Sequence, residues 1–258
     1  MSYIDIKNLY VNYKHGNKDQ IVLNNINFEI EKGEFICFIG PSGCGKSTLL
    51  NIIAGFQKPF SGEVEIDGQK VEKPSIEYVT IFQNYGLLPW KNVQKNVELG
   101  LAAKKVPKAE REAIALKYLD MVGLSSEAKK RPDQLSGGMQ QRVAIARALA
   151  VDPQIIFMDE PFGALDPITR MKLQEDLKRI ASEEKKTILF VTHDIEEAVY
   201  LADRIAIFET NPGRIKRVAR VQLPSTQRDR TSVDFLEARD KVYEALHMKR
   251  EEVVEYYI

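Results

Sequence analysis

A glycine-rich loop between a strand and a helix constrains this chain more than any other stretch. Residues 35–39 (FICFI) form an apolar run typical of a buried strand, and residues 48–54 (TLLNIIA) follow a helical pattern. Between them, GPSGCGKS at residues 40–47 matches the pattern GxxxxGK followed by Ser or Thr. Such a loop wraps around a phosphate and directs backbone N–H groups and the positive helix end at it. The sequence therefore predicts an α/β fold that binds a nucleoside triphosphate.

Two side chains at the end of this loop indicate how the phosphates are held. Lys46 is expected to reach the β- and γ-phosphates, and the Ser47 hydroxyl to ligate Mg²⁺. The chain has two cysteines, too few for a disulfide framework; Cys44 is either an oxidisable thiol or a filler position. The predicted phosphate-binding residues are Gly40, Pro41, Ser42, Gly43, Cys44, Gly45, Lys46, Ser47 and Thr48.

Length and composition limit the possible classes of protein. At 258 residues the chain can form one large α/β domain or a core with a subdomain. Lys+Arg and Asp+Glu both number 37, so the formal net charge is zero and no basic excess indicates nucleic acid. The longest apolar runs have the length of strands, and the N-terminus lacks a signal-peptide pattern. We therefore expect a cytoplasmic chain that does not bind nucleic acid.

Short strands are predicted on both sides of the phosphate loop. Residues 3–39 alternate between apolar and polar, with turns expected at residues 15–20 and 31–34, and another strand is expected at 62–68. These strands predict an antiparallel sheet beside the nucleotide-binding core. Tyr13 stands at the end of its strand, where it could stack on a base or be a half-buried strand tyrosine.

The chain changes character after Gln83, which ends a predicted strand at residues 79–82. Residues 84–92 (NYGLLPWKN) have no periodicity, and two helical patterns follow at residues 93–104 and 108–122. We interpret residues 84–134 as an inserted helical subdomain. Its only tryptophan, Trp90, and the neighbouring residues Leu87 and Leu88 are either core or a docking patch, and the pattern alone favours core.

A second anion site is predicted at a helix that runs from LSGGMQQR (residues 135–142) to about residue 150. Ser136 is suited to cap the helix, while Gly137 and Gly138 leave its first N–H groups unobstructed.

Two acidic residues follow a fully apolar strand at residues 155–161 (IIFMDEP). Apolar residues on both faces predict a central parallel strand, and ligands bind at the carboxyl ends of such strands. Asp159 suits Mg²⁺, and Glu160 could activate a water; the same pair also occurs in helix-capping turns. A helix is expected to start at Asp166 and to carry a solvated charged face as far as Lys186.

One of the three histidines stands at the carboxyl end of a buried strand (TILFVTHD, residues 187–194). We expect His193 to share a sheet edge with Gln83, Asp159 and Glu160, although a lone histidine is more often structural. A strand at residues 204–209 and a turn at 212–214 come next. One or two amphipathic helices are predicted at residues 234–257, with the inner side formed by Phe235, Leu236, Val242, Leu246 and Val253.

With these motifs in order, the chain resembles the ATP-binding-cassette (ABC) ATPases over nearly its whole length. The matching features are the phosphate loop at 40–47, Gln83, the signature LSGGMQ at 135–140, the strand and glutamate at 155–160, ALD at 164–166, and His193. The resemblance implies a RecA-like P-loop NTPase core, an antiparallel β-subdomain and an inserted α-helical subdomain. The implied boundaries are a single domain over 1–258, with a core at 1–83 and 135–220, helices at 84–134, and a helical extension at 221–258.

The resemblance also implies a mechanism in which two cassettes pair head to tail. Each ATP then lies between the phosphate loop of one chain and the signature of the other, where Ser136 and Gly138 face the partner's γ-phosphate. The implied roles are adenine stacking for Tyr13, Mg²⁺ binding through water for Asp159, general base for Glu160, and γ-phosphate sensing for Gln83 and His193. The implied set is completed by Lys46 as a catalytic residue, by Gly137, Gln140 and Asp166 as ATP contacts, and by Ser47 and Gln83 as Mg²⁺ ligands.

Within the family, the chain is most similar to importer ATPases of the nitrate, sulfonate and taurine type. This similarity depends on residues 87–101, FGALDPITR at 162–170, NPGRI at 211–215, and LP…RDR at 223–230; Asn211 replaces a more usual basic residue. No C-terminal regulatory barrel is expected. The similarity implies ATP, Mg²⁺, a second ATPase subunit, a permease docked near Leu87 to Trp90, a solute-binding protein, and a place on the cytoplasmic face of the membrane.

Two alternative functions compete with the importer. One is a cytosolic ABC ATPase that acts on ribosomes or DNA, but such chains usually carry two cassettes or a long coiled-coil insertion. The other is a P-loop kinase or GTPase, which the signature and His193 disfavour.

Overall fold

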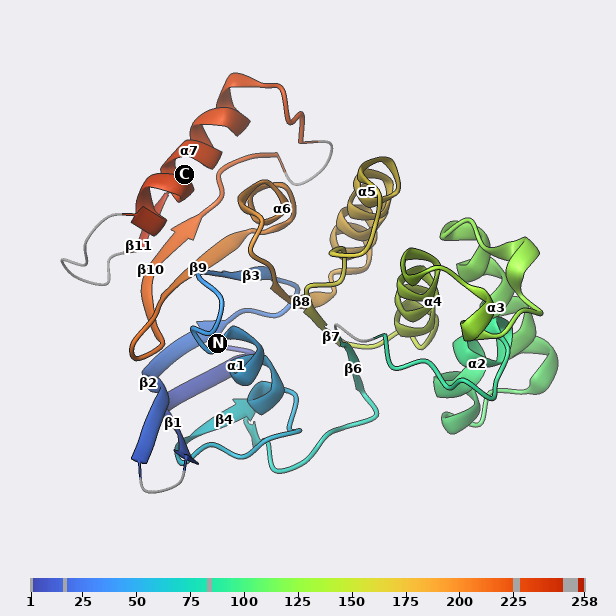
Figure 1. Ribbon diagram of the computed structural model, residues 1–258, viewed down its shortest axis with the longest axis horizontal. Coiled ribbons are helices and arrows are strands. Elements are labelled where there is room, and N and C mark those ends of the chain that lie inside the picture. Colours follow the sequence, from blue (N-terminus) through green and yellow to red (C-terminus); the bar gives the residue numbers. More distant parts are fainter. Residues whose placement is uncertain (1, 16–17, 83–84, 225–227, 248–254, 258) are drawn as a thin grey trace. The chain divides into compact units, whose positions relative to one another are not determined.

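A computed structural model describes residues 2–15, 18–82, 85–224, 228–247 and 255–257 (Figure 1). By its internal contacts the chain divides into two units, residues 1–75 with 175–258 and residues 76–174. The second unit is therefore one continuous segment, and the first contains the sequence on both sides of it.

The first unit contains the antiparallel sheet that the alternating sequence predicts. Its strand order is β2-β1-β4-β5, with β1 at Ile4–His15, β2 at Lys18–Ile30, β4 at Ser61–Ile66 and β5 at Gln69–Lys70. The loop predicted at residues 15–20 is wrong in its extent, because β1 continues to His15 and β2 begins at Lys18. Polar side chains do not prevent this pairing, since the ladder is built from backbone groups.

Parallel strands in the same unit lead to the phosphate loop. β3 (Phe35–Ile39) pairs in parallel with β8 (Thr187–Val191) and with β9 (Arg204–Glu209). Every residue of β3 and β8 is buried, as expected for apolar strands covered on both faces. Helix α1 (Lys46–Ile53) packs against β8, and α6 (Ile195–Leu201) packs against β3 (Figure 1).

The C-terminal part of the chain adds a helix and two strands. β10 (Arg214–Arg220) is antiparallel to β9, α7 (Val233–His247) packs against α6 and β9, and β11 (Glu255–Tyr257) is parallel to β10. The prediction of helix as far as residue 257 is therefore wrong in its last part. The free edge of β10 offers unpaired backbone groups, and their pairing overrides a helix-like side-chain pattern.

The inner side predicted for the terminal helix is confirmed in its centre. Phe235 and Val242 on α7 are buried, whereas Leu236 and Leu246 are half-buried. Val253 lies outside the described residues.

The second unit contains a pair of parallel strands and a group of packed helices. β6 (Tyr78–Ile81) pairs with β7 (Ile155–Asp159), as the apolar runs predict. The helices α2 (Val93–Ala103), α3 (Lys108–Met121) and α4 (Gly137–Ala150) contact one another. The predicted helical subdomain, residues 84–134, is shorter than this unit, and its boundaries stay a prediction. Short 3₁₀ turns occur at Ser125–Glu127 and Pro132–Gln134.

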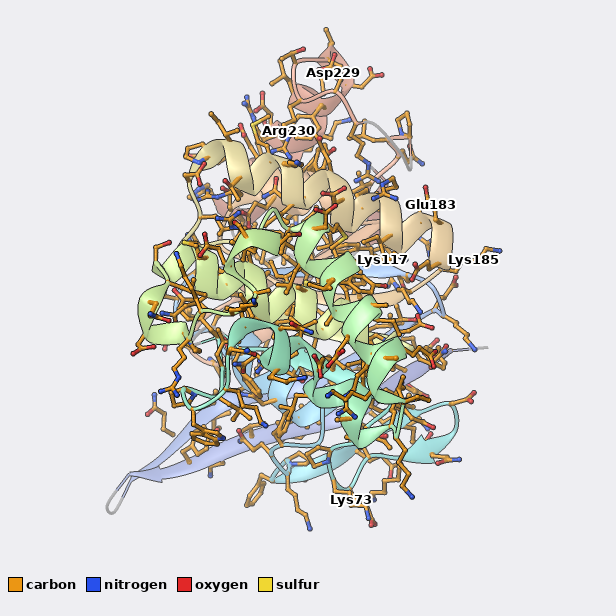
Figure 2. All side chains as sticks on the ribbon, turned by 90° about the vertical axis from the view of Figure 1, so that its right-hand side faces the viewer. Lys73, Lys117, Glu183, Lys185, Asp229 and Arg230 are labelled. Carbon is orange, nitrogen blue, oxygen red and sulfur yellow. The ribbon has the colours of Figure 1, made fainter. Side chains whose placement is uncertain are left out.

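Helix α5 (Pro167–Glu184) is longer than its neighbours and is charged along its length. Glu183 and Lys185 project outward at its end, as predicted (Figure 2). The interpretation of the charges as far as Lys186 as surface is wrong for two lysines. Lys186 is buried, and Lys178 is buried and donates to the carbonyl of Leu201 at 2.7 Å. The long apolar stem of Lys178 lies within the protein, while its ammonium caps the end of α6. Among the described residues, none of the helices is both long and apolar enough to cross a membrane.

Candidate functional site

The phosphate loop connects the end of β3 to the start of α1, which confirms the predicted strand, loop and helix. Gly45 caps α1 with φ of 95°, and a Cβ placed on it would lie 2.5 Å from Cδ2 of Leu23. Glycine is therefore required there both for the left-handed backbone and for the space. Around Gly43, by contrast, nothing lies within 4 Å of a Cβ position, so that side of the loop is open.

Lys46 is held across the loop. Its ammonium donates to the carbonyls of Gly40 at 2.7 Å and Pro41 at 3.0 Å, and its side chain is largely buried. Ser47 follows in the first turn of α1 and is exposed. The loop therefore presents an ammonium and a hydroxyl next to the positive end of a helix, an arrangement suited to phosphate.

Cys44 is enclosed by the loop. Burial raises the pKa of its thiol, so the thiol is neutral at pH 7 and poorly nucleophilic. Between the two interpretations of Cys44, the filler position is the one that this burial supports.

Tyr13 lies on β1 in the same unit and is 43% exposed. Its hydroxyl accepts a hydrogen bond from Nε2 of Gln57 at 2.6 Å. Gln57 follows α1, so this bond links the tyrosine to the helix that continues from the phosphate loop. The ring is accessible enough to stack on a base, and this role stays a prediction.

The signature segment in the second unit begins α4. Ser136 caps the helix by accepting from the N–H of Met139 at 3.3 Å, as predicted, and both Ser136 and Gly137 are exposed. The first N–H groups of a helix have no acceptor within it, so this start can bind an anion. Gln140 instead donates to the carbonyls of Pro132 and Leu135, and thereby holds the turn before the helix.

The two acids at the end of β7 differ in backbone conformation. Asp159 is the last residue of the strand, and Glu160 follows it with φ of 47°. This left-handed conformation is rare for a residue with a side chain and is concentrated at functional sites. Both acids are half-buried, so both are within reach of a ligand.

Gln141 is a site residue that sequence reasoning missed. It is buried, and its amide donates to the carbonyl of Glu160 at 3.4 Å and accepts from the N–H of Ala164 at 3.2 Å. It therefore connects the signature helix to the peptide of the predicted base. In the sequence, the sign of this role is a polar side chain on the apolar, inner face of helix α4.

Two further predicted residues lie in the turns that precede helices α5 and α6. Asp166 accepts from the N–H of Thr169 at 3.0 Å, and this bond lowers the pKa of its carboxyl. His193 is exposed in a turn fixed by Thr192, whose hydroxyl donates to Glu197 at 2.7 Å and accepts from the N–H of Asp194. Gln83 lies outside the described residues.

Comparison with known proteins identifies the family. Residues 23–163 match the family described as ABC transporter. The chain is 50% identical over 223 residues to an aliphatic sulfonates import ATP-binding protein of Bacillus cereus, and this match covers 86% of each chain. It is 48% identical over 194 residues to a nitrate import ATP-binding protein of Synechococcus elongatus, covering 74% of this chain and 71% of that one. The chain belongs to the ABC transporter family.

A solved structure supports the fold and the reaction of this ABC protein. A dimeric ATP-binding cassette in a post-hydrolysis state, bound to ADP and phosphate, is 40% identical to it with a TM-score of 0.80. The match covers 85% of this chain and 99% of that one. The predicted RecA-like P-loop NTPase fold is thereby confirmed, and the chain is an ABC ATPase that binds and hydrolyses ATP.

A second residue of the ABC ATPase that sequence reasoning missed is Arg228. It lies in the segment that served only as a subfamily marker, and it is buried. Its guanidinium donates to the carbonyls of Val199 at 2.6 Å, Tyr200 at 3.2 Å and Ala202 at 2.7 Å, at the end of α6. Burial lowers its pKa to about 10. Arg228 therefore closes the helix that starts beside His193.

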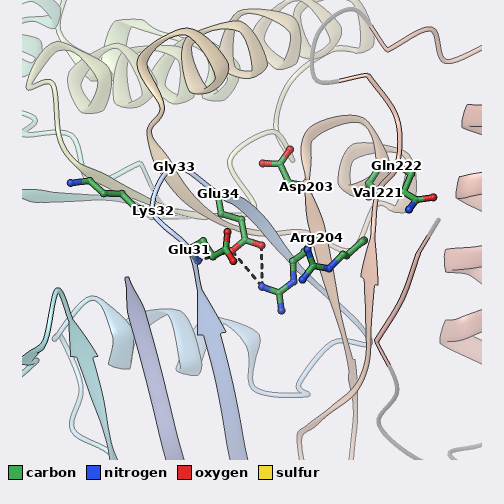
Figure 3. Close-up of a pocket in the computed structure, with 9 residues that line it drawn as sticks. Glu31, Lys32, Gly33, Glu34, Asp203, Arg204, Val221 and Gln222 are labelled. Atoms are coloured by element: carbon green, nitrogen blue, oxygen red, sulfur yellow. Dashed lines mark hydrogen bonds and ion pairs between the residues drawn. The ribbon is translucent and has the colours of Figure 1, made fainter. Parts of the chain in front are cut away.

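A separate pocket of about 390 Å³ lies at the start of β3, at the opposite end of that strand from the phosphate loop (Figure 3). Its walls include Glu31, Lys32 and Gln222. Glu34 and Arg204 form an ion pair of 3.1 Å within it. Burial nevertheless raises the pKa of Glu34, because the hydrogen bond from the N–H of Glu31 and the attraction of Arg204 do not offset the loss of water.

This raised pKa predicts how Glu34 affects stability. Between the unfolded pKa near 4.5 and the higher folded value, the folded state binds more protons, so the free energy of unfolding falls as pH rises. Glu34→Gln mimics the protonated form, and its stability relative to the wild type should therefore increase across that window. Urea denaturation of both proteins from pH 4 to pH 8 would measure this; a difference that is constant with pH would contradict it.

Proposed function

We propose that this ABC ATPase is the energy-coupling subunit of an importer for a small anion of the nitrate or sulfonate type. The observation that carries the proposal is the 50% identity, over 86% of both chains, to an aliphatic sulfonates import ATP-binding protein. The nitrate import relative supports the same class. In this proposal the chain lies on the cytoplasmic face of the membrane and works with a permease and a solute-binding protein.

We propose further that two copies pair head to tail around ATP. Each copy contributes its phosphate loop to one nucleotide and its signature helix to the other. The exposed start of α4, with a serine cap and two glycines, supports this, since it is a second anion-binding helix start in a chain with one phosphate loop. The dimeric state of the solved cassette supports it as well.

Within each proposed site, Tyr13 stacks on adenine and Lys46 holds the β- and γ-phosphates. Glu160 takes the proton of the attacking water, while Gln83 and His193 contact the γ-phosphate. The half-buried carboxyl of Glu160 and the exposed ring of His193 support these roles, because both are accessible to a ligand. From the partner, Ser136 and Gly138 bind the γ-phosphate, and Gly137, Gln140 and Asp166 complete the contacts.

The donor set suits Mg²⁺. The exposed hydroxyl of Ser47 and the half-buried carboxyl of Asp159 are hard oxygen ligands, and the amide oxygen of Gln83 is proposed as a third. Among the described residues no group of three or more His, Cys, Asp or Glu forms a metal cage. Mg²⁺ in nucleotide sites needs no such cage, because phosphate and water supply its other ligands. When bound, the ion neutralises charge that develops on the phosphates.

We propose that the permease docks on the loop from Leu87 to Trp90. Trp90 is 69% exposed, so the core interpretation is wrong for this side chain. Asn96, fully buried on α2, accepts from the N–H of Leu88 and donates to the carbonyls of Leu88, Lys91 and Asn92. These bonds make the loop a firm platform, which lowers the entropy cost of docking.

Trp90→Ala should abolish uptake of the anion while leaving ATP hydrolysis by the isolated subunit unchanged. The expected reason is the loss of a large aromatic anchor on the docking surface, in a residue that is already exposed without the permease. Uptake of labelled nitrate or sulfonate by cells that lack the native subunit would measure it. Phe60→Ala, a matched change at a side chain 74% exposed in the first unit, is the control and should restore uptake.

Purification from detergent-solubilised membranes tests the importer itself. The tagged chain should retain a membrane permease, and the Trp90→Ala variant should lose it. Co-purification with ribosomes and with no integral membrane protein would favour the cytosolic alternative.

A further inference from the structure

Gly213, in the turn between β9 and β10, lies against both β2 and the phosphate loop. The N–H of Gly213 donates to the carbonyl of Val22 at 3.0 Å, and its carbonyl accepts from the N–H of Asn24 at 3.0 Å. Gly213 thereby forms an isolated bridge with Leu23 on β2, outside the regular ladders.

There is no room for a side chain at Gly213. A Cβ placed on it would lie 2.1 Å from the carbonyl oxygen of Cys44 and 2.5 Å from that of Val22. Both are backbone atoms, which cannot rotate away as a flexible side chain does. Either the phosphate loop or the turn must therefore move if any other residue is introduced.

The phosphate loop makes two further close contacts, one with β9 and one with β2. A Cβ on Gly40 would lie 2.8 Å from the carbonyl oxygen of Phe208, at the end of β9, and Gly45 packs on Leu23. The first, middle and last parts of the loop therefore have separate supports. The middle support, Gly213, lies against the carbonyl oxygen of Cys44.

We propose that Gly213 is a positioning residue for the phosphate loop of this ATPase. Its close approach fixes the Cys44 peptide, and with it the N–H groups that follow toward Lys46. The inference rests on the proposed ATP site at this loop. It gives a function to the glycine of the NPGRI segment, which marks the turn and has no other role in the mechanism.

Gly213→Ala tests the proposal through the two cysteines. Both are buried in the native chain, Cys44 in the loop and Cys37 in β3. In the variant, a thiol reagent such as DTNB should label Cys44 rapidly and leave Cys37 protected, with the site mapped by mass spectrometry. The Kd for ATP should rise about 10–100-fold, the order expected when one hydrogen bond to a charged phosphate is lost.

The outcomes separate a positioning role from a merely structural one. Labelling of both cysteines would show general loosening and would overturn the proposal, as would an unlabelled Cys44 with unchanged ATP affinity. Labelling of Cys44 alone with unchanged affinity would also overturn it; Lys46→Ala would then show whether the proposed ATP site itself is wrong. Gly68→Ala, in the β4–β5 turn, is the control for backbone strain without a clash: φ of Gly68 is +71°, but a Cβ there meets nothing within 4 Å, so Cys44 should stay protected and the Kd unchanged.

A measurement on the wild type covers the case in which Gly213→Ala fails to fold. ADP should slow hydrogen exchange in peptides that span residues 208–215, because an ordered loop holds Gly213 against Val22. Exchange at residues 66–70, in the β4–β5 turn, should not change. Equal exchange at residues 208–215 with and without ADP would overturn the proposal.

Discussion

Glu160→Gln is expected to slow ATP hydrolysis about 10²–10⁴-fold, equivalent to about 3–5 kcal/mol, while ATP still binds. The amide keeps the size of the carboxyl but cannot accept the proton of the attacking water. Glutamine also keeps the backbone hydrogen bonds of the left-handed residue at the end of β7. The variant should therefore remain folded and accumulate as an ATP-bound dimer. Phosphate release and size-exclusion chromatography with ATP would measure both effects.

Glu183→Gln makes the same chemical change at an exposed position on α5 and should leave the rate unchanged. Wild-type turnover by Glu160→Gln would show that another group acts as the base. A loss of ATP binding would show instead that the substitution disturbs the site.

Lys46→Ala and Ser136→Arg should each lower turnover about 100-fold, yet an equal mixture of the two should recover part of it. Each substitution removes or blocks one or two charge-assisted phosphate contacts, worth about 1.5–3 kcal/mol apiece. In a head-to-tail pair of unlike variants, one site combines an intact loop with an intact signature. Random pairing gives about a quarter of the wild-type number of sites.

Titration of one variant with the other at constant total protein would measure this recovery. Mixing Lys46→Ala with itself at the same concentration is the control. If each variant alone keeps wild-type turnover, the loop and signature do not share a site. A mixture that forms no ATP-dependent dimer on the Glu160→Gln background would contradict head-to-tail pairing.

Local features of the sequence predicted much of this fold and site. The phosphate loop, the Ser136 cap and the apolar strand before Asp159 each depend on a few consecutive residues, and the structure contains all three. Their signals are strong because glycine, capping and alternation act over short distances.

Features that depend on distant backbone could not be predicted in the same way. Gln141 and Asn96 look like ordinary helix residues until their buried amides meet carbonyls and N–H groups elsewhere. Gly213 was interpreted only as part of a turn, because its neighbours Val22 and Cys44 are far away in sequence. β11 was missed since its pairing uses the edge of β10 rather than any pattern of its own.

The guanidinium of Arg228 has a consequence for anyone who shortens this chain. A fragment that ends before residue 228 keeps the ABC motifs from the phosphate loop to His193, but leaves the carbonyls of Val199, Tyr200 and Ala202 without their donor. A minimal ATPase for crystallisation or fusion should therefore retain the segment through Arg228, or replace its three bonds by redesigning the end of α6.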